Sequence, residues 1–129
     1  MTERRRYRPR PDQFVVAVPL RLDTPGFSYR KWGAEQHCKP GDWLVDNDGD
    51  IYTVDADVFA ATYRQVRRGA YQKTTPVWAE AASEDGSIPT KEGRTHYTKG
   101  DYVVFNNEDG TDGYAMSAKK FESRYEPDE

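Results

Sequence analysis

The chain has 129 residues, which predicts one domain or two very small ones that share a core. Its 19 Lys and Arg against 22 Asp and Glu give a net charge of −3, which excludes a strongly basic protein with a broad nucleic-acid footprint. A single cysteine, Cys38, excludes an internal disulfide framework and a multi-cysteine zinc site.

The first segment, residues 1–12, is predicted to be a disordered basic arm. It has no hydrophobic periodicity, and its arginines suit weak, non-specific contact with nucleic-acid phosphates; a solubilising arm is the alternative. The arginines are Arg4, Arg5, Arg6, Arg8 and Arg10. No apolar secretory h-region is present, and no apolar run approaches the ~18 residues of a membrane span. A cytoplasmic protein without membrane contact is therefore expected.

Residues 13–67 are predicted to form a first β-repeat. Residues 13–22 have strand composition. Residues 39–42 (Lys-Pro-Gly-Asp) fit a type II turn, which needs a positive φ at the position of Gly41. Residues 43–45 and 51–54 then read as two strands around the Asn-Asp-Gly-Asp hairpin turn at residues 47–50.

The first repeat is expected to close with a short helical turn. Asp55 is the predicted N-cap of this turn. Phe59 and Tyr63 are spaced i,i+4 and therefore share one face of it.

Residues 68–75 are predicted to be a linker, and residues 76–127 a second β-repeat. When the chain is shifted by about 60 residues, Gly-Asp-Trp-Leu-Val at residues 41–45 aligns with Gly-Asp-Tyr-Val-Val at residues 100–104. Ser117 takes the N-cap position, and Phe121 and Tyr125 repeat the aromatic pair. One small sheet buries too little surface alone. The expected fold is therefore mainly β with short helical turns, two pseudo-symmetric β-repeats packed as a small barrel or sandwich.

The string Pro-Gly-Asp-Trp-Leu-Val at residues 40–45, with Tyr52 and Phe-Ala-Ala-Thr-Tyr at residues 59–63, resembles small uncharacterised bacterial and phage proteins with a Pro-Gly-Asp-aromatic motif. The second half resembles them too, with Lys99 in place of the proline and Arg124 in place of the threonine. The resemblance covers about 30 residues in each half. It implies a small β-rich module and a phage-related or defence-related setting, and it brings no catalytic residue to this chain.

The candidate ligand-binding residues combine cations, aromatic rings and the only two histidines. Aromatic rings stack on planar ligands, and cations pair with phosphate or carboxylate groups. The candidates are Tyr29, Arg30, Lys31, Trp32, His37, Lys91 and His96. The alternative is a solvated strand with a tryptophan in the core. Two histidines without a clear third ligand make a thin metal site, so neither a metal nor a cofactor is expected.

These observations favour a non-enzymatic module that binds a small anionic or nucleotide-like molecule between the two halves, for signal sensing or sequestration. The main alternative is a protein-protein interaction or assembly module, such as a homodimer or a docking domain for a partner, without a small ligand. A hydrolase using the histidines and neighbouring aspartates is the third hypothesis.

Overall fold

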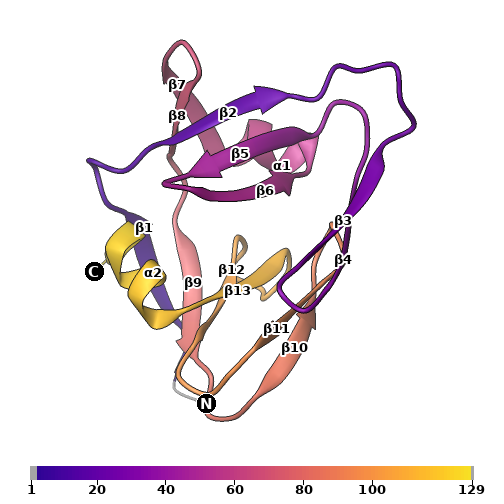
Figure 1. Ribbon diagram of the computed structural model, residues 1–129. Coiled ribbons are helices and arrows are strands. Elements are labelled where there is room, and N and C mark those ends of the chain that lie inside the picture. The colour runs from indigo at the N-terminus through magenta and orange to yellow at the C-terminus, as the bar shows by residue number, and fades with distance from the viewer. Residues whose placement is uncertain (1–2, 129) are drawn as a thin grey trace.

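The computed structural model describes residues 3–128 and is mainly β, with two helices of seven residues each (Figure 1). The elements of the first half are β1 (Arg5–Pro9), β2 (Val15–Pro19), β3 (Phe27–Lys31), β4 (Ala34–Cys38), β5 (Trp43–Asn47), β6 (Asp50–Val54), α1 (Ala56–Thr62), β7 (Tyr63–Arg67) and β8 (Ala70–Lys73). Those of the second half are β9 (Val77–Ala81), β10 (Gly86–Pro89), β11 (Arg94–Tyr97), β12 (Tyr102–Phe105), β13 (Gly113–Met116), α2 (Ala118–Arg124) and β14 (Tyr125–Pro127).

The strands form two five-stranded antiparallel sheets and two hairpins. The first sheet has the order β6-β5-β2-β8-β7, and the second has the order β13-β12-β9-β1-β14. In Figure 1 the first sheet lies above the second, and hairpin β3–β4 descends from it to lie beside hairpin β10–β11. The mainly-β prediction is confirmed. The barrel is not observed, because within residues 3–128 neither sheet closes on itself.

The prediction of a disordered arm over residues 1–12 is wrong where the structure describes this segment. Residues 5–9 form β1, which pairs with both β9 and β14. The arginines of β1 face an acidic strand end: Arg6 contacts Asp128 at 2.8 Å and Arg8 contacts Glu126 at 2.7 Å. These ion pairs neutralise the arginines of β1, and Tyr7 of the same strand packs against Phe121 in the core. Any nucleic-acid contact through these arginines would compete with their carboxylate partners.

The linker predicted over residues 68–75 is also wrong, because half of it is a strand. Residues 70–73 form β8, which lies between β2 and β7 inside the first sheet. The first sheet therefore extends beyond residue 67, where the first repeat was predicted to end, and includes strand β8. Only the short stretch of residues 74–76 separates β8 from β9.

The two sheets contain corresponding strands in the same order and with the same register. Ala17 of β2 lies opposite Val45 of β5, and Ala79 of β9 lies opposite Val104 of β12. The hairpins also correspond, since β3 pairs with β4 as β10 pairs with β11. The place that β8 takes in the first sheet is taken by β1 in the second.

Each sheet buries one face around a phenylalanine from its own helix. Phe121 of α2 is 1% exposed and stacks on Tyr102 with ring centroids 4.2 Å apart. Phe59 of α1 is 2% exposed and stacks on Trp43, also at 4.2 Å. Because few aliphatic side chains are available, these offset aromatic contacts carry much of the apolar burial.

The predicted turns and caps are confirmed. Gly41 has a φ of +91°, and the amide of Asp42 donates to the carbonyl of Lys39 at 3.1 Å, as the turn requires. The side chain of Asp55 accepts from two amides of the first turn of α1, and that of Ser117 accepts from the amide of Lys120. No helix in the described part of the chain is long and apolar enough to cross a membrane.

Candidate ligand-binding cavity

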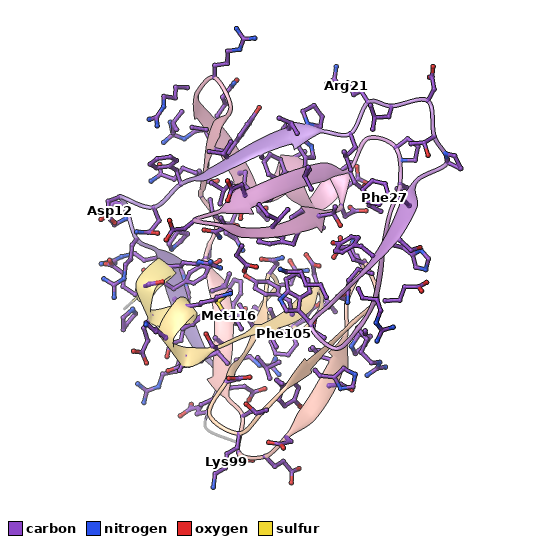
Figure 2. The ribbon with its side chains drawn as sticks, in the orientation of Figure 1. Asp12, Arg21, Phe27, Lys99, Phe105 and Met116 are labelled. Carbon is purple, nitrogen blue, oxygen red and sulfur yellow. The ribbon has the colours of Figure 1, made fainter. Side chains whose placement is uncertain are left out.

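A cavity of about 390 Å³ lies between the two sheets. Its walls come from β5, β6, α1, β7 and β8 on one side and from β13, α2 and β14 on the other, with β11 and the turns of both hairpins at one end. Figure 2 shows Met116, one of the lining residues, near the middle of the molecule, whereas Asp12, Arg21 and Lys99 lie at the periphery. The volume falls within the ~300–1,000 Å³ that is typical of small-molecule sites.

Asparagine and tyrosine side chains line the cavity from corresponding positions of both sheets. On the first side the amide of Asn47 donates to the hydroxyl of Tyr52 at 3.2 Å. On the second side the hydroxyls of Tyr114 and Tyr125 lie 3.2 Å apart. Burial raises the pKa of Tyr52 above its usual value. Burial also raises the pKa values of Tyr63 and Tyr114, and neighbouring tyrosines add to the rise at these two residues. These hydroxyls are therefore neutral and able to donate hydrogen bonds into the cavity.

The partly buried carboxylate of Asp50 lies near three cations at the cavity wall. Asp50 contacts Lys31 at 2.9 Å and Lys120 at 3.2 Å, and Arg124 lies 3.9 Å away. Burial acts to raise the pKa of Asp50, but hydrogen bonds and charges from Lys31 and Lys120 outweigh it and hold that pKa below its usual value. Three positive groups around one negative group leave a local excess of positive charge.

Lys73 is a further cation of the cavity, and its hydrogen-bond partners are neutral, although Asp112 accepts from the amide of one of them, Asn106. Its Nζ donates to Oδ1 of Asn106 at 2.8 Å and to the hydroxyl of Tyr114 at 3.1 Å. It also lies over the rings of Tyr114 and Tyr125, at 5.4 and 5.6 Å from their centroids. Among residues 3–128, no carboxylate forms an ion pair with it. This ammonium group is thus held in place without being neutralised.

The two hairpins meet at the cavity through a reciprocal pair of backbone hydrogen bonds. The amide of His37 donates to the carbonyl of Glu92 at 2.6 Å, and the amide of His96 donates to the carbonyl of Trp32 at 3.0 Å. Gly33 allows this approach, because a Cβ at that position would lie 2.9 Å from the His96 ring. The two hairpin turns are thereby fixed at the cavity.

Several of the sequence-predicted ligand residues lie at this cavity. Trp32, Lys91 and His96 line it. Lys31 contacts the lining residue Asp50. The hydroxyl of Tyr29 shares a 2.6 Å hydrogen bond with the hydroxyl of the lining residue Thr53. Arg30 and His37 are exposed and do not line it. The ring of His37 contacts Ser28 and Glu35 instead. No group of three metal-ligating side chains occurs within the described range.

Sequence reasoning missed the central residues of the cavity. They are Asn47, Tyr52, Tyr63, Lys73, Asn106, Tyr114, Arg124 and Tyr125. A signal was present, because these asparagines and tyrosines recur at corresponding places in the two aligned halves. However, a tyrosine on a short strand is usually interpreted as a core residue. Lys73 was not considered because it lies in the segment that was predicted to be a linker.

Glu92 is the half-buried carboxylate at the rim. Its Oε2 accepts from the amide of Asp55 at 3.0 Å. Burial is the main reason that its pKa rises from 4.5 to about 7, and the charges of Asp42 and Asp55 add to the rise. Because the folded state holds this proton more tightly than the unfolded chain, the stability that it contributes is complete below pH 4.5 and is lost as the pH rises through about 7.

We therefore expect Glu92→Gln to be more stable than the wild type at pH 8, by about 1–2 kcal/mol after allowance for partial exposure. Glutamine keeps an acceptor for the Asp55 amide and cannot ionise. Urea unfolding of both proteins between pH 4.5 and pH 8 measures the effect. A stability difference that stays constant across this range would contradict the assignment.

Comparison of the chain with protein-family models, curated proteins and solved structures finds no match.

Proposed function

We propose that this chain is a binding module that takes a small anionic, nucleotide-like molecule into the cavity between its sheets, and that it senses or sequesters that molecule. The observation that carries this proposal is the set of cations at the cavity. Lys73 has no carboxylate partner in the described chain, and Asp50 is outnumbered by Lys31, Lys120 and Arg124. The lining also holds the carboxylates of Asp50, Glu92, Asp101 and Asp112, against the cations Lys73, Lys91, Lys120 and Arg124. The positive charge is therefore local, at Lys73 and at the cations around Asp50, and a partly desolvated local excess of this kind is stabilised by an anion.

The proposal includes an internal duplication in which one small β-unit was copied and the two copies share the cavity. The matching strand orders and registers support it. Under this correspondence three cations of the cavity have neutral counterparts in the other copy. Lys73 corresponds to Pro9, Lys120 to Val58 and Arg124 to Thr62. The two copies thus differ where positive charge enters the cavity, which favours one anionic ligand over two equivalent ones.

The aromatic lining supports a ligand that also carries a planar ring. Trp32 and Tyr52 lie with ring centroids 5.7 Å apart at the hairpin end of the cavity. An indole beside a phenol offers a stacking surface, and the lining hydroxyls and amides supply donors and acceptors for ring edges. A purine or pyrimidine with a phosphate group matches this combination of an apolar face and a cationic wall.

The test is calorimetric titration with a nucleoside monophosphate panel, with the parent nucleosides and inorganic phosphate as separate arms. We expect binding of at least one nucleotide, and we expect Lys73→Met to weaken it by about tenfold or more, because a charge-assisted hydrogen bond contributes ~1.5–3 kcal/mol. Methionine keeps most of the aliphatic stem of lysine. Lys99→Met, on an exposed turn far from the cavity, is the control and should bind as the wild type does.

Binding by the nucleoside arm alone would contradict the anionic part of the proposal. A flat response across all arms, from protein that unfolds cooperatively, would overturn the proposal as a whole. Trp32→Leu separates the two contributions, since it should weaken nucleotide binding while leaving any phosphate binding unchanged.

A protein-interaction or assembly module remains the second candidate. It is favoured by a different observation, the row of exposed apolar side chains on the central strand β2 of the first sheet. Such a function needs no small ligand.

A further inference from the structure

The outer face of the first sheet exposes apolar side chains at its centre. Phe14 precedes β2, and Val16 and Val18 alternate along it, with exposed fractions of 45%, 49% and 50%. Ile51 on the edge strand β6 is 45% exposed and lies in the same cross-strand row as Val16. Because β2 is the middle strand, this patch is a face of the sheet and not a frayed edge. Asp46 lies between Val16 and Ile51 in that row, so the apolar centre of the face is the row of Phe14, Val16 and Val18 along β2. An exposed apolar row of this kind marks an interaction site in many proteins.

Charges of opposite sign that form no ion pair lie on the two sides of the β2 row of this patch. On the β5 side is Asp46, which lies opposite Val16 and therefore points to the same face. On the β7 side are Arg64 and Arg67, and the guanidinium of Arg67 lies 4.8 Å from the centroid of the Phe14 ring. Within residues 3–128 none of these three side chains forms an ion pair. The face is acidic on one flank and basic on the other.

The corresponding face of the second sheet is covered by the chain itself. Val103 and Phe105 of β12 are buried there beneath Ile88 and Tyr97 of hairpin β10–β11. In the first sheet the position of Phe105 is held by Asp46. The position of Tyr97 is held by the small Cys38, which cannot reach across the strands. The outer face of the first sheet therefore has no covering hairpin side chains of this kind, and it carries the charged Asp46 where the second sheet has Phe105.

We propose that a second copy of this chain covers the outer face of the first sheet, in a symmetric face-to-face dimer with its two-fold axis parallel to β2. That rotation exchanges the two flanks, so the acidic flank of each copy meets the basic flank of the other. Asp46 of one copy then lies above Ala70 of its partner, a small residue next to Arg67 in the same row. A perpendicular axis would place like charges together, so the charge pattern selects this arrangement. The inference does not depend on the proposed ligand.

The size of the face sets the strength of the dimer. Five strands spaced ~4.8 Å apart and about five residues long give a face of roughly 400 Å² on each copy. The pair would bury about 800 Å² in total, below the ~1,200 Å² of standard interfaces, so a weak and concentration-dependent dimer is expected.

Sedimentation velocity of the full chain over about 10 µM to 1 mM tests the proposal in the range where weak complexes dissociate. We expect the average mass to rise from that of a monomer towards that of a dimer. Asp46→Lys alone and Arg67→Glu alone should each raise the dissociation constant at least tenfold, because each places like charges at both contacts. The two variants mixed in equal amounts should associate again, since the mixed pair restores opposite charges at both contacts.

Two substitutions on the second half, Glu84→Lys and Lys99→Glu, change the net charge in the same way and serve as controls. They should dimerise as the wild type does. A monomer at every concentration would overturn the proposal, and so would a dimer that Asp46→Lys and Arg67→Glu leave intact. Failure of the mixed variants to reassociate, with circular dichroism showing both folded, would overturn the two-fold arrangement.

Discussion

Replacement of Phe121 by alanine is expected to lower the free energy of unfolding by about 3–5 kcal/mol, which is a large part of the stability of a domain of this size. Phe121 is 1% exposed and touches three aromatic rings. It stacks on Tyr102, meets Tyr7 edge-on with centroids 4.8 Å apart, and stacks on Tyr125 at 5.1 Å. Alanine would leave a cavity that rigid rings on three different elements cannot fill. Guanidinium unfolding followed by tyrosine and tryptophan fluorescence measures the loss.

A matched comparison separates this aromatic core from general effects of truncation. Phe59→Ala, at the corresponding position of α1, should cost a similar amount, because Phe59 contacts Trp43, Tyr63 and Tyr71 in the same manner. Phe27→Ala removes a ring that is 45% exposed and should cost less than about 1 kcal/mol. If Phe121→Ala were as mild as Phe27→Ala, the cores described above would be wrong.

Replacement of Asp42 by alanine is expected to cost about 2–4 kcal/mol, since it leaves buried donors without an acceptor. The Asp42 side chain is almost fully buried, and its carboxylate accepts from the amides of Lys39 and Ala56, each at 3.0 Å. It also accepts from Nζ of Lys39 at 2.8 Å. One carboxylate thus ties the turn before β5 to the start of α1. Thermal and urea unfolding provide the measurement.

Asp101 at the corresponding turn supplies the control. Its carboxylate accepts from the amide and the hydroxyl of Thr98 but has no helix partner, and it is more exposed. Asp101→Ala should therefore cost about 1 kcal/mol, the usual contribution of a single turn cap. Equal losses at Asp42 and Asp101 would show that the link to α1 contributes nothing.

Much of the local structure could be predicted from the sequence because it depends on neighbouring residues. The positive φ of Gly41 and the caps at Asp55 and Ser117 follow from backbone chemistry within a few residues. The i,i+4 spacing of Phe59 and Tyr63 likewise placed both rings on one face, where they stack with centroids 4.6 Å apart. Such features need no knowledge of the distant chain.

The elements that sequence reasoning missed depend on partners far away in the chain. Strand β1 is polar, and what holds it in the sheet is distant in sequence: β9 and β14 beside it, Phe121 beneath Tyr7, and Glu126 and Asp128 opposite its arginines. Lys73 enters the cavity only because β8 inserts between β2 and β7. Exposure of Arg30 and His37 follows from the strand alternation of hairpin β3–β4, which composition alone did not reveal.

The position of β1 has a consequence for how the chain folds during synthesis. Tyr7 pairs with Val77 and with Pro127, so β1 finds its neighbours only after β9 and then β14 have been synthesised. The first sheet has no such delay, because all five of its strands have been synthesised once β8 is complete. The second sheet is therefore completed after the first, and its completion joins β1 to strands that lie about 70 and about 120 residues later in the sequence.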